Sequence, residues 1–219
     1  VCNHHEQACA IAAEGYARIS NKIGIAYVTT GPGGTNAITG VYGAWVDSIP
    51  TMIISGQVKF QTTIASQPKL NLRQLGDQEV NIVDIVRPIT KYAVMITDKN
   101  SVKFHLQKAV YEAKHGRPGP VWLDVPLDIQ GAMVDEADLV EFKIPEEPKF
   151  DTKIPQVLDA LKAAKRPVII AGNGITLAGA NEEFLKLIEN LKIPVIGTFA
   201  RYDIVRNDHE LFFGRYGTI

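Results

Sequence analysis

The sequence predicts an α/β protein in which a doubly wound, mainly parallel sheet has flanking helices and is followed by part of a second Rossmann-like α/β domain. Short apolar runs bounded by Gly or Pro recur along the chain, and helix-length segments separate them. Such runs are typical of strands buried on both faces of a parallel sheet, and their alternation with helices indicates βαβ units. The composition agrees, because 46% apolar and 21% charged residues exclude disordered, collagen-like and coiled-coil classes.

The first unit, which we place at residues 1–127, alternates helices with strands from its first turn onward. The expected elements are, in order, a helix at residues 6–19, a strand at 23–29, a helix at 35–46, strands at 50–55 and 92–96, a helix at 101–115 and a strand at 120–125.

A change of composition separates this unit from the rest of the chain. Residues 128–150 carry acidic side chains and prolines with little periodicity, so we expect a surface linker there. The alternation then restarts, and we assign residues 151–219 to the start of a second, truncated domain. Its expected elements are a helix at residues 154–165, a strand at 167–171, a helix at 181–191 and a strand at 194–197.

Charge and cysteine content narrow the classes of function. The chain has 23 basic and 24 acidic residues and a net charge of −1, which argues against nucleic-acid and anionic-membrane partners. No apolar run approaches the ~20 residues that a membrane-spanning helix needs. The only two cysteines, Cys2 and Cys9, fit neither a disulfide framework nor a zinc site. A reducing cytoplasm is the expected compartment.

The chain ends suggest a piece of a longer protein. The sequence begins with Val1 rather than Met, with no signal peptide before it, and it stops shortly after an apolar stretch. We therefore expect a fragment.

The segment that opens the first helix contains a candidate acid–base residue. Glu6, Ala10, Ala13 and Ala17 are spaced four, three and four apart, so they share one helical face. Small alanines permit close approach of a neighbouring backbone, and partial burial of Glu6 would raise its pKa toward a useful range. The alternative is a solvated first-turn acid that the helix dipole favours.

A glycine-rich segment, residues 31–36, lies between an expected strand and an expected helix. Glycines allow a tight turn and close ligand approach, and free N–H groups at a helix N-terminus attract anions. The segment is not the G-x-G-x-x-G fingerprint, because Asn36 occupies the third glycine position. A structural turn and a binding loop both remain open, and the same holds for residues 172–174 in the second unit.

Polar residues follow the second strand and a later loop. Gln57 lies at the carboxyl end of its strand, where open α/β sheets bind ligands, and Gln78 lies beyond a polar loop. The Gln57 amide can donate and accept hydrogen bonds together, as recognition of a heterocycle edge requires. Ordinary loop polarity is the alternative.

Five stretches in order resemble the thiamine-diphosphate-dependent enzymes of the acetolactate synthase type. Four match the pyrimidine-binding domain of that family, and the last matches the start of its central domain. The stretches are residues 4–18 (HHEQACAIAAEGYAR), 25–58, 76–94, 116–129 (GRPGPVWLDVPLDI) and 163–198.

The resemblance implies a role for each matched residue. Glu6 corresponds to the glutamate that hydrogen-bonds the aminopyrimidine of thiamine diphosphate and favours its imino tautomer. A largely buried carboxyl suits that proton relay. The residues implied to bind or border the cofactor are Glu6, Pro32, Gly33, Asn36, Gln57 and Gln78.

The same resemblance implies a 2-oxo acid decarboxylase or carboligase, a transferase or lyase that condenses an enamine derived from pyruvate with an acceptor carbonyl. It implies Mg²⁺ held by a C-terminal diphosphate-binding domain outside this chain, and a homodimer or homotetramer in which that domain of a partner subunit faces Glu6. The fragment alone is then expected to be inactive. Whether the second unit binds FAD stays open.

This sequence departs from the family pattern in three places. The loop at residues 60–75 is longer than in a typical acetolactate synthase, Asp77 replaces a usual Phe, and residues 202–218 diverge. These positions leave the acceptor substrate open. Two alternatives also remain, a plain Rossmann-type nucleotide-binding module and a non-catalytic relative of the family; the presence of Glu6 argues against the second.

Overall fold

A computed structural model describes residues 1–147 and 150–217 of the chain. These residues form two compact units, Val1–Pro145 and Glu146–Ile219, which we describe separately. The boundary predicted after residue 127 and the assignment of each unit to a cofactor domain stay predictions. Residues 148, 149, 218 and 219, which belong to the predicted linker and second domain, lie outside the described residues.

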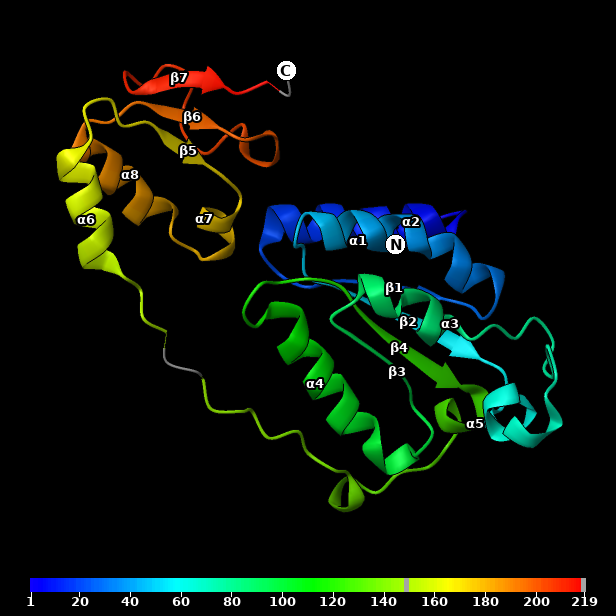
Figure 1. The fold of residues 1–219 in the computed structure, drawn as a ribbon. Helices are drawn as coiled ribbons and strands as arrows, with labels where there is room; N and C mark the ends of the chain where they lie inside the picture. The colour runs from blue at the N-terminus through cyan, green and yellow to red at the C-terminus, as the bar shows by residue number, and fades with distance from the viewer. Residues whose placement is uncertain (148–149, 218–219) are drawn as a thin grey trace. The chain divides into compact units, whose positions relative to one another are not determined.

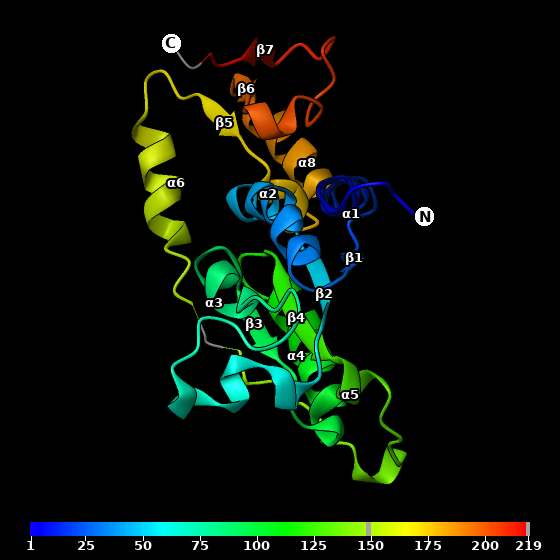
Figure 2. The ribbon, with the colours of Figure 1, turned by 90° about the vertical axis from the view of Figure 1, so that its right-hand side faces the viewer.

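The first unit contains a four-stranded sheet with strand order β1-β2-β4-β3, and every pairing in it is parallel (Figures 1 and 2). Every helix and strand predicted from the sequence of this unit is present, and the two short helices α3 and α5 are additions. The elements are α1 Glu6–Ser20, β1 Gly24–Val28, α2 Pro32–Val46, β2 Thr51–Gln57, α3 Ile82–Val86, β3 Tyr92–Met95, α4 Val102–Lys114, β4 Val121–Pro126 and α5 Leu127–Gln130.

Helices cover both faces of this sheet, as the predicted doubly wound fold requires. On one face, Ile53 of β2 and Trp122 of β4 pack with α1, α2 and α3. On the other, Met52 and Leu123 pack with Ala109 and Ala113 of α4. Figure 1 shows α4 on the opposite side of the strands from α1 and α2. The predicted α/β class is confirmed.

The expectation that the strands are buried on both faces is wrong for β1, and β3 is only partly buried along its length. Ile25 and Tyr27 are 50% and 72% exposed, whereas β2 and β4 are buried almost throughout. The reason is position: β1 is an edge strand that pairs only with β2 among the described residues, and no described helix covers Ile25 and Tyr27. Alternation of apolar and polar residues, which marks a strand with one solvated face, is absent from this segment.

The predicted alanine face of α1 is confirmed and sets the distance between α1 and α2. Ala10, Ala13 and Ala17 are buried. A Cβ atom built on Gly40 of α2 would lie 2.6 Å from the Ala10 Cβ, far inside contact distance. The two helices therefore pack backbone against backbone, and this packing fixes the start of α1 beside the start of α2.

We expect Gly40→Ala to destabilise the first unit by about 1–3 kcal/mol, because the added methyl group forces the helices apart. Gly15→Ala in α1 is the matched control. A Cβ at Gly15 meets nothing within 4 Å, so better helix propensity should stabilise the protein by up to about 1 kcal/mol. Urea unfolding of both variants checks this pair, and equal midpoints would contradict the close packing.

The second unit has a three-stranded parallel sheet of order β5-β6-β7. Its core includes Phe184 and Ile188 of α8, packed on Ala171 and Val195 of the strands. Both predicted strands and both predicted helices are present; α7 and β7 are additions. The elements are α6 Ile154–Ala163, β5 Ile169–Ala171, α7 Gly174–Leu177, α8 Asn181–Leu191, β6 Val195–Gly197 and β7 Phe212–Arg215.

The first part of the segment predicted as a linker lies along α4. The Val140 N–H donates to the Asn100 carbonyl at 2.9 Å, and the Phe142 N–H donates to Gln107 Oε1 at 2.8 Å. Residues up to Pro145 therefore belong to the first compact unit. None of the helices in the described part of the chain has the length and apolar character to cross a bilayer.

Candidate cofactor site

Glu6 is the first residue of α1, and its carboxylate faces the start of α2. His5 caps the helix, because its Nδ1 accepts the Gln7 N–H at 3.1 Å. Asn36 Nδ2 of α2 donates to Glu6 Oε2 at 3.1 Å. The close packing of α1 on α2 thus brings two predicted site residues, thirty positions apart in sequence, into direct contact.

The pKa of Glu6 is lowered, which corrects the expectation that burial raises it. The hydrogen bond that Asn36 donates is the largest cause, followed by one from the backbone N–H of Glu6, and together they outweigh the opposing effect of desolvation. The carboxylate is only half-buried in this chain, so water still solvates it. Glu6 is therefore an ionised acid at the start of a helix, and Asn36 orients it. This state is close to the alternative given above, a solvated first-turn acid that the helix dipole favours.

The glycine-rich segment forms the first turn of α2 rather than an open loop. The helix begins at Pro32, three residues before the predicted start, because proline suits the first helical position. Gly31 has φ +58°, and a Cβ there would lie 2.3 Å from the Gln78 carbonyl oxygen. Gly31 is therefore required by its left-handed conformation and by the close approach of Gln78.

Gly33 leaves space next to the Glu6 carboxylate. A Cβ on Gly33 would lie 2.7 Å from Thr29 Cγ2 and 3.7 Å from Glu6 Oε1. The absence of a side chain at this position keeps the surroundings of Oε1 open, while Oε2 is occupied by Asn36. A side chain at position 33 would therefore clash with Thr29 and come into contact with the Glu6 carboxylate.

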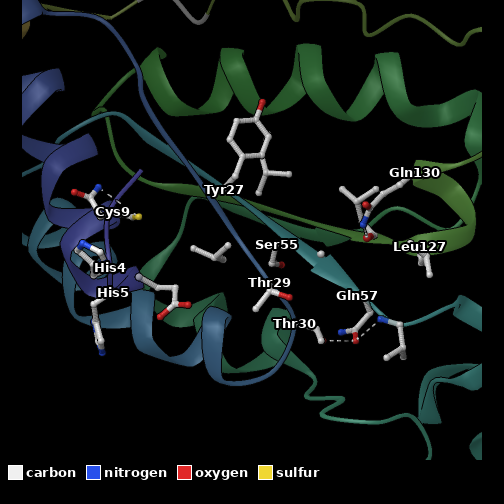
Figure 3. Close-up of a pocket in the computed structure, with 17 residues that line it drawn as sticks. His4, His5, Cys9, Tyr27, Thr29, Thr30, Ser55, Gln57, Leu127 and Gln130 are labelled. Carbon is white, nitrogen blue, oxygen red and sulfur yellow. Dashed lines mark hydrogen bonds between the residues drawn. The ribbon is translucent and has the colours of Figure 1, made fainter. Parts of the chain in front are cut away.

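A cavity of about 820 Å³ lies at the carboxyl ends of β1 and β2 (Figure 3). Of the predicted site residues, Glu6 and Gln57 line it, whereas Pro32, Gly33, Asn36 and Gln78 are not among its lining residues. Apolar walls come from Val28 and Ile54. The other lining residues used below are Thr30 and Ser55.

The Gln57 amide is fully engaged within the protein. Its Oε1 accepts from Thr30 Oγ1 at 2.8 Å and from the Val58 N–H at 3.0 Å. Its Nε2 donates to the Val80 carbonyl at 3.2 Å and to Asp124 Oδ2 at 3.0 Å. The predicted use of this amide to read a heterocycle edge therefore has no free donor or acceptor direction in this structure.

Asp124 is a buried carboxyl beneath the cavity that the sequence reasoning missed. It is 0% exposed and accepts from Ser55 Oγ at 2.6 Å as well as from Gln57. The Ser55 hydroxyl in turn accepts the Trp122 Nε1–H at 2.8 Å. Burial raises the pKa of Asp124 to about 6, against the lowering effect of its two hydrogen bonds. The signal in the sequence is an acidic residue inside the apolar run of β4.

The loop after β2 is built from three short 3₁₀ turns, and Glu79 holds it. One carboxylate oxygen of Glu79 accepts the Ile64 N–H at 2.7 Å, and the other accepts the N–H groups of Leu75 and Gly76 at 3.2 and 3.1 Å. The loop at residues 60–75, which the sequence marks as longer than usual, is therefore tied at both ends to one side chain.

We expect Glu79→Ala to loosen this loop and to speed tryptic cleavage after Lys69 or Arg73 several-fold, because three backbone donors lose their acceptor. Asp77→Ala is the control, since Asp77 is an exposed acid two residues away. Equal cleavage rates in the two variants would contradict the role of Glu79.

Two family models match the chain. The model for the N-terminal TPP binding domain of thiamine pyrophosphate enzymes matches residues 1–82, and the model for their central domain matches residues 154–219. The chain belongs to the thiamine pyrophosphate enzymes. The matches follow the order of the two compact units and give no support to a plain Rossmann-type nucleotide-binding module.

The chain is similar to acetolactate synthases and to a glyoxylate carboligase. The acetolactate synthase large subunit of Lactococcus lactis is 36% identical over 217 residues, which cover 97% of this chain and 36% of the relative. The isozyme 3 large subunit of acetolactate synthase from Escherichia coli is 35% identical over 97% of the chain and 37% of the relative. Glyoxylate carboligase of E. coli O157:H7 is 34% identical over 97% of the chain and 35% of the relative. The chain spans about a third of the length of these relatives.

Proposed function

We propose that this chain is part of a thiamine-diphosphate-dependent 2-oxo acid decarboxylase or carboligase of the acetolactate synthase type. The observation that carries the proposal is the Glu6 carboxylate, which Asn36 orients at the edge of an 820 Å³ cavity. The cavity lies where open α/β sheets bind ligands, and its apolar walls suit a heterocycle.

The residues present fit the cofactor on chemical grounds. Thiamine diphosphate, when bound, supplies the stabilised carbanion that the decarboxylation of a 2-oxo acid requires. Glu6 Oε1 is left open beside Gly33 and can hold a proton shared with a ring nitrogen. A ring placed there excludes water from the carboxylate, so desolvation raises its pKa toward that of the nitrogen and eases transfer of the proton.

The other predicted residues take supporting roles in this proposal. Asn36 orients Glu6, Gly33 keeps room for the ring next to Pro32, and Gln78 packs its backbone against the turn at Gly31. We propose that Gln57 positions the cavity residue Thr30 and does not contact the cofactor directly. Its amide already has four hydrogen-bond partners within the protein.

We place the reaction in a longer polypeptide. Since the relatives are about three times as long, we propose that the chain alone does not turn over substrate and that Mg²⁺ and the diphosphate bind outside it. In the described residues no group of three or more His, Cys, Asp or Glu is placed to hold a metal. A homodimer or homotetramer in the cytoplasm, with a partner subunit facing Glu6, completes the proposal.

The donor substrate that we propose is pyruvate. We propose that the loop at residues 60–75, which Glu79 binds, determines which acceptor substrate is used. Two relatives with different names, acetolactate synthase and glyoxylate carboligase, match this chain almost equally well. The shared part of the sequence therefore supports the common cofactor chemistry rather than one acceptor.

The test is release of carbon dioxide from pyruvate by the full-length enzyme with Mg²⁺, measured with and without thiamine diphosphate. Release that depends on thiamine diphosphate supports the proposal. Saturable NAD binding without any thiamine dependence would support the nucleotide-binding alternative instead.

A further inference from the structure

The orientation of the Gln57 amide is fixed by groups that cannot reverse their polarity. The Val58 N–H is always a donor, and it lies 3.0 Å from Oε1. The Val80 carbonyl is always an acceptor, and it lies 3.2 Å from Nε2. A flipped amide would set donor against donor at Val58 and acceptor against acceptor at Val80 and Asp124.

This fixed amide determines which way the Thr30 hydroxyl points. Thr30 Oγ1 lies 2.8 Å from Gln57 Oε1, which is an acceptor only, so the single hydroxyl hydrogen of Thr30 is donated to Gln57 (Figure 3). The hydroxyl oxygen therefore keeps its lone pairs and has no hydrogen left to offer. Thr30 is half-buried and is one of the residues that line the cavity, so a ligand group that reaches Oγ1 from the cavity meets an acceptor with no free hydrogen.

Asp124 strengthens this arrangement from below. Its Oδ2 accepts from Gln57, and its Oδ1 accepts from Ser55, which itself receives the Trp122 N–H. A buried, fully satisfied network of this kind holds its members in one arrangement. The donor role of the Thr30 hydroxyl is thus imposed by the Gln57 amide and the protein groups that hold that amide, and not by a ligand.

We propose that Thr30 is a ligand-binding residue that acts only as a hydrogen-bond acceptor, and that its partner is an N–H group of the bound cofactor. The inference rests on the proposed function. Pyruvate at neutral pH carries acceptor oxygens and no donor, so it cannot be the partner of Thr30. The amino group of an aminopyrimidine is a donor of the required kind, and Glu6 in the same cavity accepts hydrogen as well.

Two substitutions at Thr30 in the full-length enzyme test this assignment. Thr30→Val keeps the shape and removes the acceptor, whereas Thr30→Ser keeps the hydroxyl; Thr30→Ala replaces the valine variant if that variant does not fold. The dissociation constant for thiamine diphosphate in the presence of Mg²⁺ is measured by tryptophan fluorescence, and kcat with pyruvate is measured beside it. We expect Thr30→Val to weaken cofactor binding about tenfold and Thr30→Ser to bind like the wild type.

Each other outcome has a defined meaning. An unchanged dissociation constant for thiamine diphosphate in Thr30→Val, even with a tenfold lower kcat that serine restores, would overturn the assignment of a cofactor N–H group as the partner of Thr30. Wild-type values in Thr30→Val, or equal losses in the valine and serine variants, would overturn the inference and leave the proposed function standing. A wild-type enzyme that binds no thiamine diphosphate would overturn both.

Discussion

Glu6→Gln is expected to lower thiamine-dependent carbon dioxide release from pyruvate about 100-fold or more in the full-length enzyme. The glutamine amide has nearly the same shape, and its oxygen can still accept from Asn36 Nδ2. It cannot take up or release a proton at neutral pH, however, so the acid–base role is lost while the fold and the cavity remain. The assay is the initial rate of release at saturating thiamine diphosphate and Mg²⁺.

Glu14→Gln is the matched control for this experiment. Glu14 lies on the same helix and has an ion pair with Arg18, at 2.5 Å between Arg18 Nη2 and Glu14 Oε1, outside the lining of the cavity. Loss of this partly buried ion pair should cost about 1–2 kcal/mol of stability and leave the rate within about twofold of the wild type. A Glu6→Gln enzyme as active as Glu14→Gln would remove Glu6 from the mechanism.

The second large effect concerns the buried Asp124. Its pKa is raised from 3.8 to about 6 in the folded protein, so the folded state binds a proton more tightly than the unfolded chain between these values. The contribution of Asp124 to the free energy of unfolding is therefore largest at pH 4 and below, and it falls as the pH rises from about 4 to about 6. A shift of this size corresponds to about 3 kcal/mol.

Asp124→Asn imitates the protonated acid, because the asparagine oxygen can accept from Gln57 while its amide faces Ser55. We expect this variant to unfold at a higher urea concentration than the wild type at pH 8, and the difference to shrink as the pH falls to 4. Asp124→Ala should be less stable than the wild type at every pH by about 2–4 kcal/mol, since Ser55 and Gln57 each lose a buried partner. An asparagine variant that is less stable than the wild type at pH 8 would contradict the raised pKa.

The order of helices and strands could be predicted from the sequence because local patterns determine it. The runs at β2 and β4 are mostly apolar, and the structure buries both strands between helices. The spacing of Ala10, Ala13 and Ala17 identified the face of α1 that packs against α2. In each case the residues that carry the signal are neighbours in sequence or on one helical face.

Features set by distant parts of the chain could not be predicted in this way. The exposure of Tyr27 follows from the edge position of β1, which depends on how the strands order in space. The lowered pKa of Glu6 depends on Asn36, thirty residues later in the sequence. The full hydrogen bonding of the Gln57 amide depends on Asp124. An acid inside an apolar strand is a signal for such a network, but it does not identify the partners.

The most direct test of the account is a structure of the full-length enzyme with thiamine diphosphate and Mg²⁺ bound. We expect the pyrimidine ring to lie in the cavity at the carboxyl ends of β1 and β2, with a ring nitrogen within about 3 Å of a Glu6 carboxylate oxygen. A cofactor bound elsewhere, with the Glu6 carboxylate in open water in the assembled protein, would contradict it.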